Sequence, residues 1–126
     1  MKRLPYAGRL GIVTHHEAGA APICTMPPGR HVEGRPSFLH GGAIAGLLEI
    51  AAYAAIEQAF DEDERAQVKP ISVNVEYMRN GNMQETFAQG RVLRIGSRIA
   101  NVTAEAWQDD RNRPIAMARM MFSLRR

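Results

Sequence analysis

Residues 41–60 of the chain read GGAIAGLLEIAAYAAIEQAF and carry the clearest structural signal in the sequence. Apolar residues recur there at intervals of three and four, the period of an α-helix, up to the acidic residues 61–64. The pattern predicts one helix of roughly 20 residues, about 30 Å long. Between Gly41 and Ile56 the only charged residue is Glu49, and so apolar a segment is typical of a helix buried on nearly all sides.

The sequence around this helix predicts β-strands. Residues 71–78 alternate between apolar side chains, from Ile71 to Tyr77, and mainly polar ones, which is typical of a half-buried strand. Short turns rich in Gly, Asn and Asp separate the later strands, so consecutive strands are expected to run antiparallel. The predicted strands are two short ones within residues 10–26, followed by 71–78, 86–95, 98–108 and 115–124.

Together these elements predict an α+β fold: an antiparallel sheet of about five to six strands wrapped around one long central helix, in a single domain over residues 1–126. One helix covers one face of such a sheet and leaves its edges open. The last predicted strand is apolar on both faces, with Met120 and Phe122 on one and Met117 and Met121 on the other. Because such a strand needs cover on both sides, we expect a homodimer or a homotetramer.

Composition narrows the classes of function. The single cysteine, Cys24, excludes internal disulfides and multi-cysteine zinc sites. For the same reason we expect no metal. The longest charge-free stretch, around Ala43 to Leu48, is far too short to span a bilayer, so we expect a cytoplasmic protein. Residues 1–65 carry 6 basic and 8 acidic side chains, and residues 66–126 carry 10 and 5. With only eight aromatic residues for base stacking, the basic half favours a small phosphorylated ligand over nucleic acid, or is a solvated surface.

Two features of the predicted helix suggest chemistry. Glu49 lies on the flank of the apolar stripe, where it either pairs with an arginine of the sheet, reaches solvent, or has a function. Gly41 and Gly42 bring free backbone N–H groups to the first turn, where a ligand can approach and an oxyanion would be stabilised. The same glycines would equally suit close packing. Glu49 lies two turns further on, so it would serve the start of a second helix across a dimer interface.

The segment Leu39-His40-Gly41-Gly42, with an acidic residue nine positions after the histidine, resembles the HGG signature of the hotdog-fold acyl-CoA thioesterases, in their PaaI-like branch. Further segments are similar to recurring parts of that family, and together they cover nearly the whole chain. They are Pro5-Tyr6-Ala7, Leu10-Gly11-Ile12, residues 73–79 and Gly96-Ser97-Arg98.

The resemblance implies a hotdog fold and a hydrolase that converts an acyl-CoA thioester to free acid and CoA at a subunit interface, without a cofactor. The thioester carbonyl oxygen would lie on the N–H of Gly41, with Gly42 allowing close approach. Glu49 of the opposing subunit would act as general base or as nucleophile through a mixed anhydride. His40 would hold the loop rather than transfer protons. Arg79, Arg91, Arg94 and Arg98 are candidates for binding the CoA phosphates, and Arg98, next to the Gly96-Ser97 turn, is the best placed.

The chain departs from the family pattern at two positions. Gly34 stands where an Asn or Gln is usual, with Arg35 beside it as a substitute, and Pro70 stands where a Ser or Thr often helps to orient water. Tyr53, one turn beyond Glu49, would either donate a hydrogen bond to Glu49 or narrow the acyl pocket. The departures motivate an alternative function, a non-catalytic acyl-CoA-binding hotdog protein that senses or sequesters its ligand. A dehydratase or hydratase is disfavoured because no histidine follows Glu49.

Overall fold

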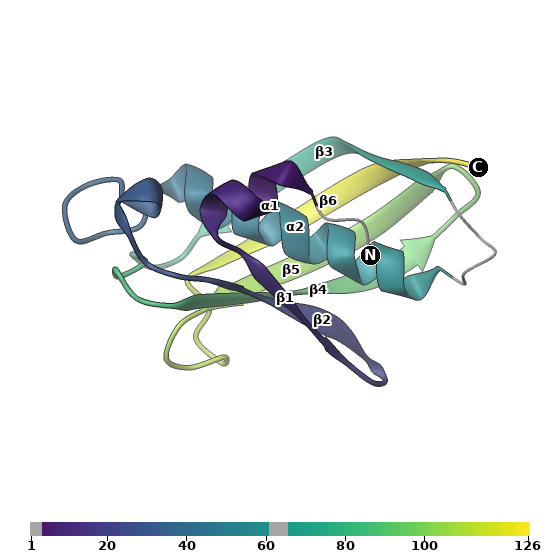
Figure 1. Cartoon of the computed structure of the whole chain (residues 1–126). Coiled ribbons are helices and arrows are strands. Elements are labelled where there is room, and N and C mark those ends of the chain that lie inside the picture. The colour runs from purple at the N-terminus through teal and green to yellow at the C-terminus, as the bar shows by residue number, and fades with distance from the viewer. Residues whose placement is uncertain (1–3, 61–65) are drawn as a thin grey trace.

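The computed structural model describes residues 4–60 and 66–126, and the strands in these ranges form one antiparallel sheet with the order β1-β2-β4-β5-β6-β3. The long helix α2 lies across one face of this sheet (Figure 1). This arrangement confirms the predicted α+β class and hotdog fold. The elements are α1 (Pro5–Leu10), β1 (Val13–Glu17), β2 (Ala20–Met26), the 3-10 helix η1 (Arg30–Val32), α2 (Gly41–Ala59), β3 (Gln67–Tyr77), β4 (Thr86–Ile95), β5 (Ile99–Trp107) and β6 (Ala116–Arg125).

The helix α2 is the centre of the hydrophobic core, as the sequence predicts. Leu47, Leu48 and Ile56 are fully buried, and the helix packs mainly on β4, β2 and β5. The sheet meets it with very small residues. A Cβ atom on Gly90 of β4 would lie 2.7 Å from the carbonyl oxygen of Ala51, so the helix can approach β4 this closely only because residue 90 is glycine. The acidic run 61–64 lies outside the described residues.

The N-terminal segment contains the two predicted strands and one helix that the pattern did not predict. The six residues of α1 begin with Pro5 at the first helical position and end at Gly11, whose φ of 72° is left-handed. Both are ordinary helix signals, but one and a half turns are too short to show a helical period. Neither α1 nor α2 combines the length and hydropathy that a membrane-spanning helix needs, and the described ranges hold no other α-helix.

The strand β3 differs from its prediction in extent and in burial. It begins at Gln67, four residues before the predicted start, and includes Pro70, which an edge strand tolerates because one side of its backbone is unpaired. The sequence predicted that the apolar face of this strand is buried. This prediction is wrong, because Ile71, Val73 and Tyr77 on that face are exposed, at 51%, 45% and 53%. The reason is position: β3 is the last strand of the sheet, beyond β6, whereas α2 packs mainly on β4, β2 and β5.

Candidate active site

His40 caps the start of α2 and occupies most of the free backbone donors there. Its Nδ1 atom accepts a hydrogen bond from the N–H of Gly42 at 2.8 Å. Its carbonyl oxygen accepts from the N–H groups of Ala43 at 3.0 Å and Ile44 at 3.2 Å. The remaining N–H of the first turn, that of Gly41, has no hydrogen-bond partner within residues 4–60 and 66–126. The helix start therefore offers one unused donor.

The cap also constrains the histidine itself. Because Nδ1 accepts the hydrogen bond from Gly42, a neutral His40 carries its proton on Nε2. A Cβ atom on Gly42 would lie 2.9 Å from this Nδ1, so a side chain there would displace the capping ring. This geometry supports the predicted role of His40 as a residue that holds the loop.

The unused N–H belongs to a residue that lines a cavity of about 310 Å³. The cavity lies where the loop before α2 meets the end of β3 and the turn that follows it. This loop is fixed to the turn by a hydrogen bond of 2.9 Å from the N–H of Leu39 to the carbonyl oxygen of Gly81. The cavity is lined by Gly34, Arg35, Leu39, His40, Gly41, Ile44, Tyr77, Arg79, Asn80 and Gly81.

The glycine at position 34 has a steric reason. A Cβ atom there would lie 2.9 Å from the Cα atom of His40, which is backbone and cannot rotate away. The loop is closed tightly at this point, because the N–H of Gly34 donates to the carbonyl oxygen of Phe38 at 2.9 Å and the N–H of His40 donates to that of Val32 at 2.8 Å. A loop with this shape has no room for the Asn or Gln that the family usually carries.

No pattern in the sequence predicts a role for Tyr77. Its hydroxyl group donates a hydrogen bond of 2.7 Å to the carbonyl oxygen of Gly41, so an edge strand and the first turn of α2 are joined directly. The signal available in the sequence was weak. Tyr77 is the last apolar-face residue of its strand, and the polar end of a tyrosine there suggests a partner, but only the fold shows that the partner is Gly41.

Glu49 lies apart from this cavity. It is half-buried on α2, eight residues after Gly41, which corresponds to about 12 Å along the helix axis. Within the described part of the chain it has no hydrogen bond or ion pair. The alternative in which Glu49 pairs with an arginine of the sheet is therefore wrong. A single chain does not bring the carboxylate and the Gly41 donor together.

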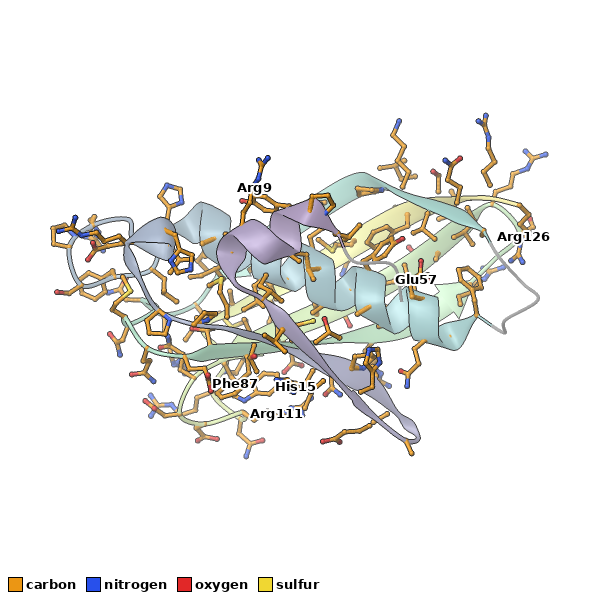
Figure 2. The ribbon with its side chains drawn as sticks, viewed as in Figure 1. Arg9, His15, Glu57, Phe87, Arg111 and Arg126 are labelled. Atoms are coloured by element: carbon orange, nitrogen blue, oxygen red, sulfur yellow. The ribbon has the colours of Figure 1, made fainter. Side chains whose placement is uncertain are left out.

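Tyr53 has a different partner from the predicted one. Burial, a hydrogen bond to Glu57 and the negative charge of Glu57 together raise the pKa of Tyr53 to about 12. Glu57 lies one further turn along α2 (Figure 2). The predicted hydrogen bond from Tyr53 to Glu49 is thus replaced by one to Glu57, which leaves the Glu49 carboxylate without a local donor.

The predicted arginines lie in different parts of the structure, and two of them, Arg91 and Arg94, are on β4. Arg35 and Arg79 line the cavity beside Gly41, and the Arg35 guanidinium lies 5.2 Å from the centre of the Phe38 ring. Arg98 lies at the opposite end of the sheet, in the turn between β4 and β5, where its carbonyl oxygen accepts a hydrogen bond from Leu124. Within one chain Arg98 is therefore not part of this site.

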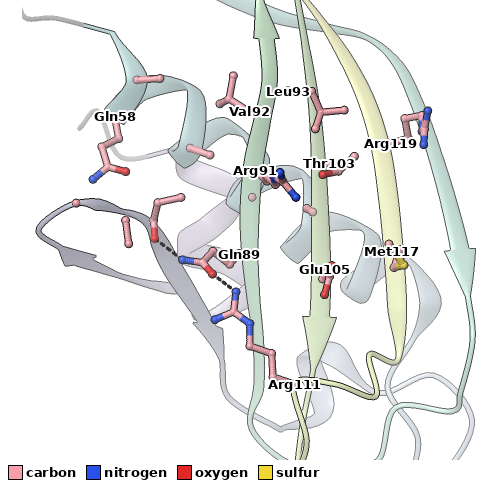
Figure 3. A pocket seen from close by; sticks show the side chains of 17 residues that line it. Gln58, Gln89, Arg91, Val92, Leu93, Thr103, Glu105, Arg111, Met117 and Arg119 are labelled. Atoms are coloured by element: carbon pink, nitrogen blue, oxygen red, sulfur yellow. Dashed lines mark hydrogen bonds between the residues drawn. The ribbon is translucent and has the colours of Figure 1, made fainter.

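A larger cavity, of about 950 Å³, is lined by Arg91 but by none of the other predicted site residues. It lies where the hairpin of β1 and β2 diverges from β4 (Figure 3). Here the side chain of Gln89, on β4, links β2 to the loop after β5. Its Nε2 donates a hydrogen bond of 2.6 Å to the carbonyl oxygen of Ala21, and its Oε1 accepts one from Arg111. Within the described residues, no group of three or more His, Cys, Asp or Glu side chains could hold a metal ion.

Comparison with solved structures identifies the class of fold. A phenylacetic acid degradation-related protein from Ralstonia eutropha has 18% identity and a TM-score of 0.82, covering 97% of this chain and 92% of its own. A Bacillus halodurans protein solved with CoA has 18% identity and a TM-score of 0.85, covering 98% and 80%. A protein from Chromobacterium violaceum has 34% identity and a TM-score of 0.74, covering 96% and 83%. No curated protein matches the sequence.

The family is defined by the sequence match. The profile of the acyl-CoA thioesterase N-terminal domain matches residues 31–123, which include the capped start of α2, Glu49, the strands β3, β4 and β5, and most of β6. The chain thus has the hotdog architecture. It belongs to the acyl-CoA thioesterase family, which confirms the resemblance seen in its sequence.

Proposed function

We propose that this protein hydrolyses an acyl-CoA thioester to the free acid and CoA, in a homodimer whose two sites each combine residues of both subunits. The observation that carries the proposal is the unused N–H of Gly41. It is the one donor of the first turn of α2 without a partner in the described residues, and Gly41 lines a cavity. A fixed backbone donor at a helix start is suited to stabilising the oxyanion of a thioester under attack.

A second subunit is needed because the chain's own Glu49 is too far from Gly41. The exposed apolar side of β3 supports pairing of this edge with the same strand of a second copy. Such pairing would place two α2 helices on the same side of a continuous sheet. Glu49 of the partner subunit would then face the Gly41 donor.

The chemistry then follows from these two groups. As general base, Glu49 of the partner subunit takes a proton from water while the water oxygen bonds to the thioester carbon, and the carbonyl oxygen becomes an oxyanion on the N–H of Gly41. Collapse of the tetrahedral intermediate breaks the carbon–sulfur bond, and the CoA thiolate recovers the proton. As nucleophile, the carboxylate would displace the CoA thiolate, which breaks the carbon–sulfur bond and forms a mixed anhydride; water then opens the anhydride to release the free acid and restore Glu49. After a single turnover in ¹⁸O-water, label found in Glu49 by mass analysis would establish the anhydride, because the general-base route places the label in the product acid only.

The arginines support CoA as the carrier. Arg35 and Arg79 lie at the cavity and could meet phosphate groups of CoA. Antiparallel pairing of β3 with its copy would bring the start of one strand beside the end of the other. Arg98 lies at the end of the sheet where β3 begins. Ser123 of β6 pairs with Ile99, the neighbour of Arg98, on one side and with Lys69 of β3 on the other. Arg98 of the partner subunit would therefore approach the same cavity from across the interface.

A proline at position 41 tests the oxyanion donor directly. Residue 41 is the first residue of α2, where proline is well tolerated, and His40 before it is already extended with a ψ of 134°. Gly41→Pro removes the N–H, whereas the control Gly41→Ala keeps it and places its Cβ in ordinary contact, 3.4 Å from the Tyr77 ring. We expect kcat for the best acyl-CoA to fall roughly a hundred- to a thousandfold in Gly41→Pro only. Equal rates in the two variants would contradict the proposal.

A non-catalytic acyl-CoA-binding protein is the second candidate. It is favoured by the tight loop at Gly34 and by Pro70, because neither position offers a side chain that could orient water. Thiol release from short, medium, long and aromatic acyl-CoAs decides between the candidates, with Glu49→Gln and Glu49→Ala as matched variants. Hydrolysis predicts turnover that falls about a hundredfold or more in both variants. Binding of an ester with no turnover in the unmodified protein would favour the binding function.

A further inference from the structure

The peptide group between Gly41 and Gly42 is held at both of its ends. Its carbonyl oxygen, on Gly41, accepts the hydrogen bond of 2.7 Å from the Tyr77 hydroxyl. Its N–H, on Gly42, donates the hydrogen bond of 2.8 Å to His40 Nδ1. A glycine backbone is otherwise the most mobile in the chain, so these two side chains fix a unit that its own residues leave free.

The preceding peptide group, between His40 and Gly41, is held at its carbonyl end only. The His40 carbonyl oxygen accepts hydrogen bonds from Ala43 and Ile44, and the other end is the unused N–H of Gly41. Both peptide planes that meet at the Gly41 Cα atom are thus anchored. The direction of the unused N–H follows from the anchoring of its neighbours.

We infer that Tyr77 is a positioning residue that aims the N–H of Gly41 at the reacting carbonyl, an inference that rests on the proposed function. Three of the anchoring contacts come from α2 and the residue before it, and they would persist in any helix capped in this way. The contact from Tyr77 alone ties the first turn to the sheet. It comes from β3, where Tyr77 pairs with Ala116 of β6, 36 residues away from Gly41.

The position of the Tyr77 phenol is set by the strand β3 and not by burial of the side chain. About half of the Tyr77 side chain is exposed, yet its ring lies close to Gly41, with ring atoms 3.4 and 3.5 Å from the position of a Cβ atom there. Loss of the hydroxyl would therefore leave the fold and the cavity wall nearly unchanged. It would remove one hydrogen bond and let the first turn shift relative to the bound ester.

The test compares Tyr77→Phe with Tyr6→Phe. Tyr6 is similarly exposed, at 49%, and its hydroxyl has no hydrogen bond in the described part of the chain. We expect Tyr77→Phe to lower kcat roughly three- to tenfold with an unchanged KM, the size that loss of one hydrogen bond allows, and Tyr6→Phe to leave both constants unchanged. A merely structural role would change the thermal stability of Tyr77→Phe without this split between kcat and KM.

Infrared spectroscopy measures the hydrogen bond from the Gly41 N–H to the thioester carbonyl. Octanoyl-CoA and benzoyl-CoA labelled with ¹³C at the thioester carbonyl are bound to Glu49→Gln, in which the ester survives, and to its double variant with Tyr77→Phe. The N–H of Gly41 should lower the carbonyl stretching frequency, and the double variant should recover part of this decrease. Amide NMR of Gly41 and Gly42 reports the same clamp without any ester, and Tyr77→Phe should shift both resonances more than Tyr6→Phe does.

The outcomes separate this inference from the proposed function. Turnover that falls in Glu49→Gln but is equal in Tyr77→Phe and Tyr6→Phe would overturn the role of Tyr77 and leave the hydrolysis standing. An ester that binds without turnover but loses its carbonyl shift in the double variant would overturn the hydrolysis and support Tyr77. If neither ester binds, unchanged Gly41 and Gly42 resonances in Tyr77→Phe overturn the inference, and a shift of both supports the clamp on which it depends.

Discussion

The two edge strands of the sheet differ in length and in chemistry. The edge strand β1 has five residues, VTHHE, four of them polar. The edge strand β3 has eleven residues and exposes Ile71 and Val73. Short, polar edges resist pairing with another chain, whereas long apolar edges invite it. The comparison indicates that β1 ends the sheet and that β3 is suited to continue it into a second subunit.

The largest effect should come from placing a charge on the apolar edge. Val73→Arg on β3 and Val13→Arg on β1 are matched, since the two valines are 45% and 52% exposed. We expect Val73→Arg to yield monomers, because a buried unpaired guanidinium at an interface is costly, and to lower turnover about a hundredfold or more, since each site needs two subunits. Val13→Arg should change neither quantity. Light scattering after size exclusion and thiol release measure both.

Two results would contradict this dimer. A Val73→Arg protein that stays dimeric would move the interface away from β3. A monomer that keeps full turnover would show that one chain holds a complete site, against the 12 Å or so that separate Gly41 from Glu49 along the helix.

Mixed dimers test whether β3 joins the two subunits. Glu49→Gln and Gly41→Pro should each be inactive as homodimers. If β3 joins the subunits so that Gly41 of one meets Glu49 of the other, random mixing gives half hybrids, and each hybrid has one intact site. We expect activity of roughly a quarter of the unmodified protein after mixing, by counting sites in a two-fold dimer. No recovery after verified subunit exchange would mean that both groups act from the same chain.

The elements that the sequence predicted most reliably are those whose apolar residues are buried in the chain's own core. The helix α2 begins at the predicted residue, and β4 has the predicted limits, because burial against the chain's own core leaves a clear period. The alternation in β3 was equally clear, but its interpretation failed. A strand with one apolar face has the same pattern whether its own helix or a second subunit covers it, and only the position of β3 at the sheet edge distinguishes the two.

The sequence indicated which residues of the candidate site lie at the start of α2, but it did not predict their contacts, and the roles of these residues stay predictions. Gly41 and His40 could be found because a helix start has known donors and caps. The hydrogen bond from Tyr77 to Gly41 joins residues 36 apart and depends on how the end of β3 meets the start of α2, which no local pattern contains. The tight approach of Gly34 to the His40 backbone likewise depends on the closed loop.

The smallest expected effect concerns Tyr53, on the line of half-buried residues formed by Glu49, Tyr53 and Glu57 at every fourth position of α2. Its pKa of about 12 is raised above the ordinary 10, first by burial and then by Glu57. The neutral phenol is therefore favoured in the folded state, and the stability this contributes is complete below pH 10 and lost as the pH rises toward 12. Glu57→Gln should lower the pKa only in part, since burial is the larger cause.

Ultraviolet titration of the phenolate, with Tyr53→Phe to assign the signal, connects this residue to the edge comparison. If pairing of β3 brings a second α2 alongside, the dimer buries Tyr53 further and its pKa should exceed that of the Val73→Arg monomer. The Val13→Arg protein should titrate like the unmodified one. Equal Tyr53 midpoints in the dimer and in the Val73→Arg monomer would show that this line of α2 stays open to solvent when β3 is paired, and Glu49 would then need another route to the partner's cavity.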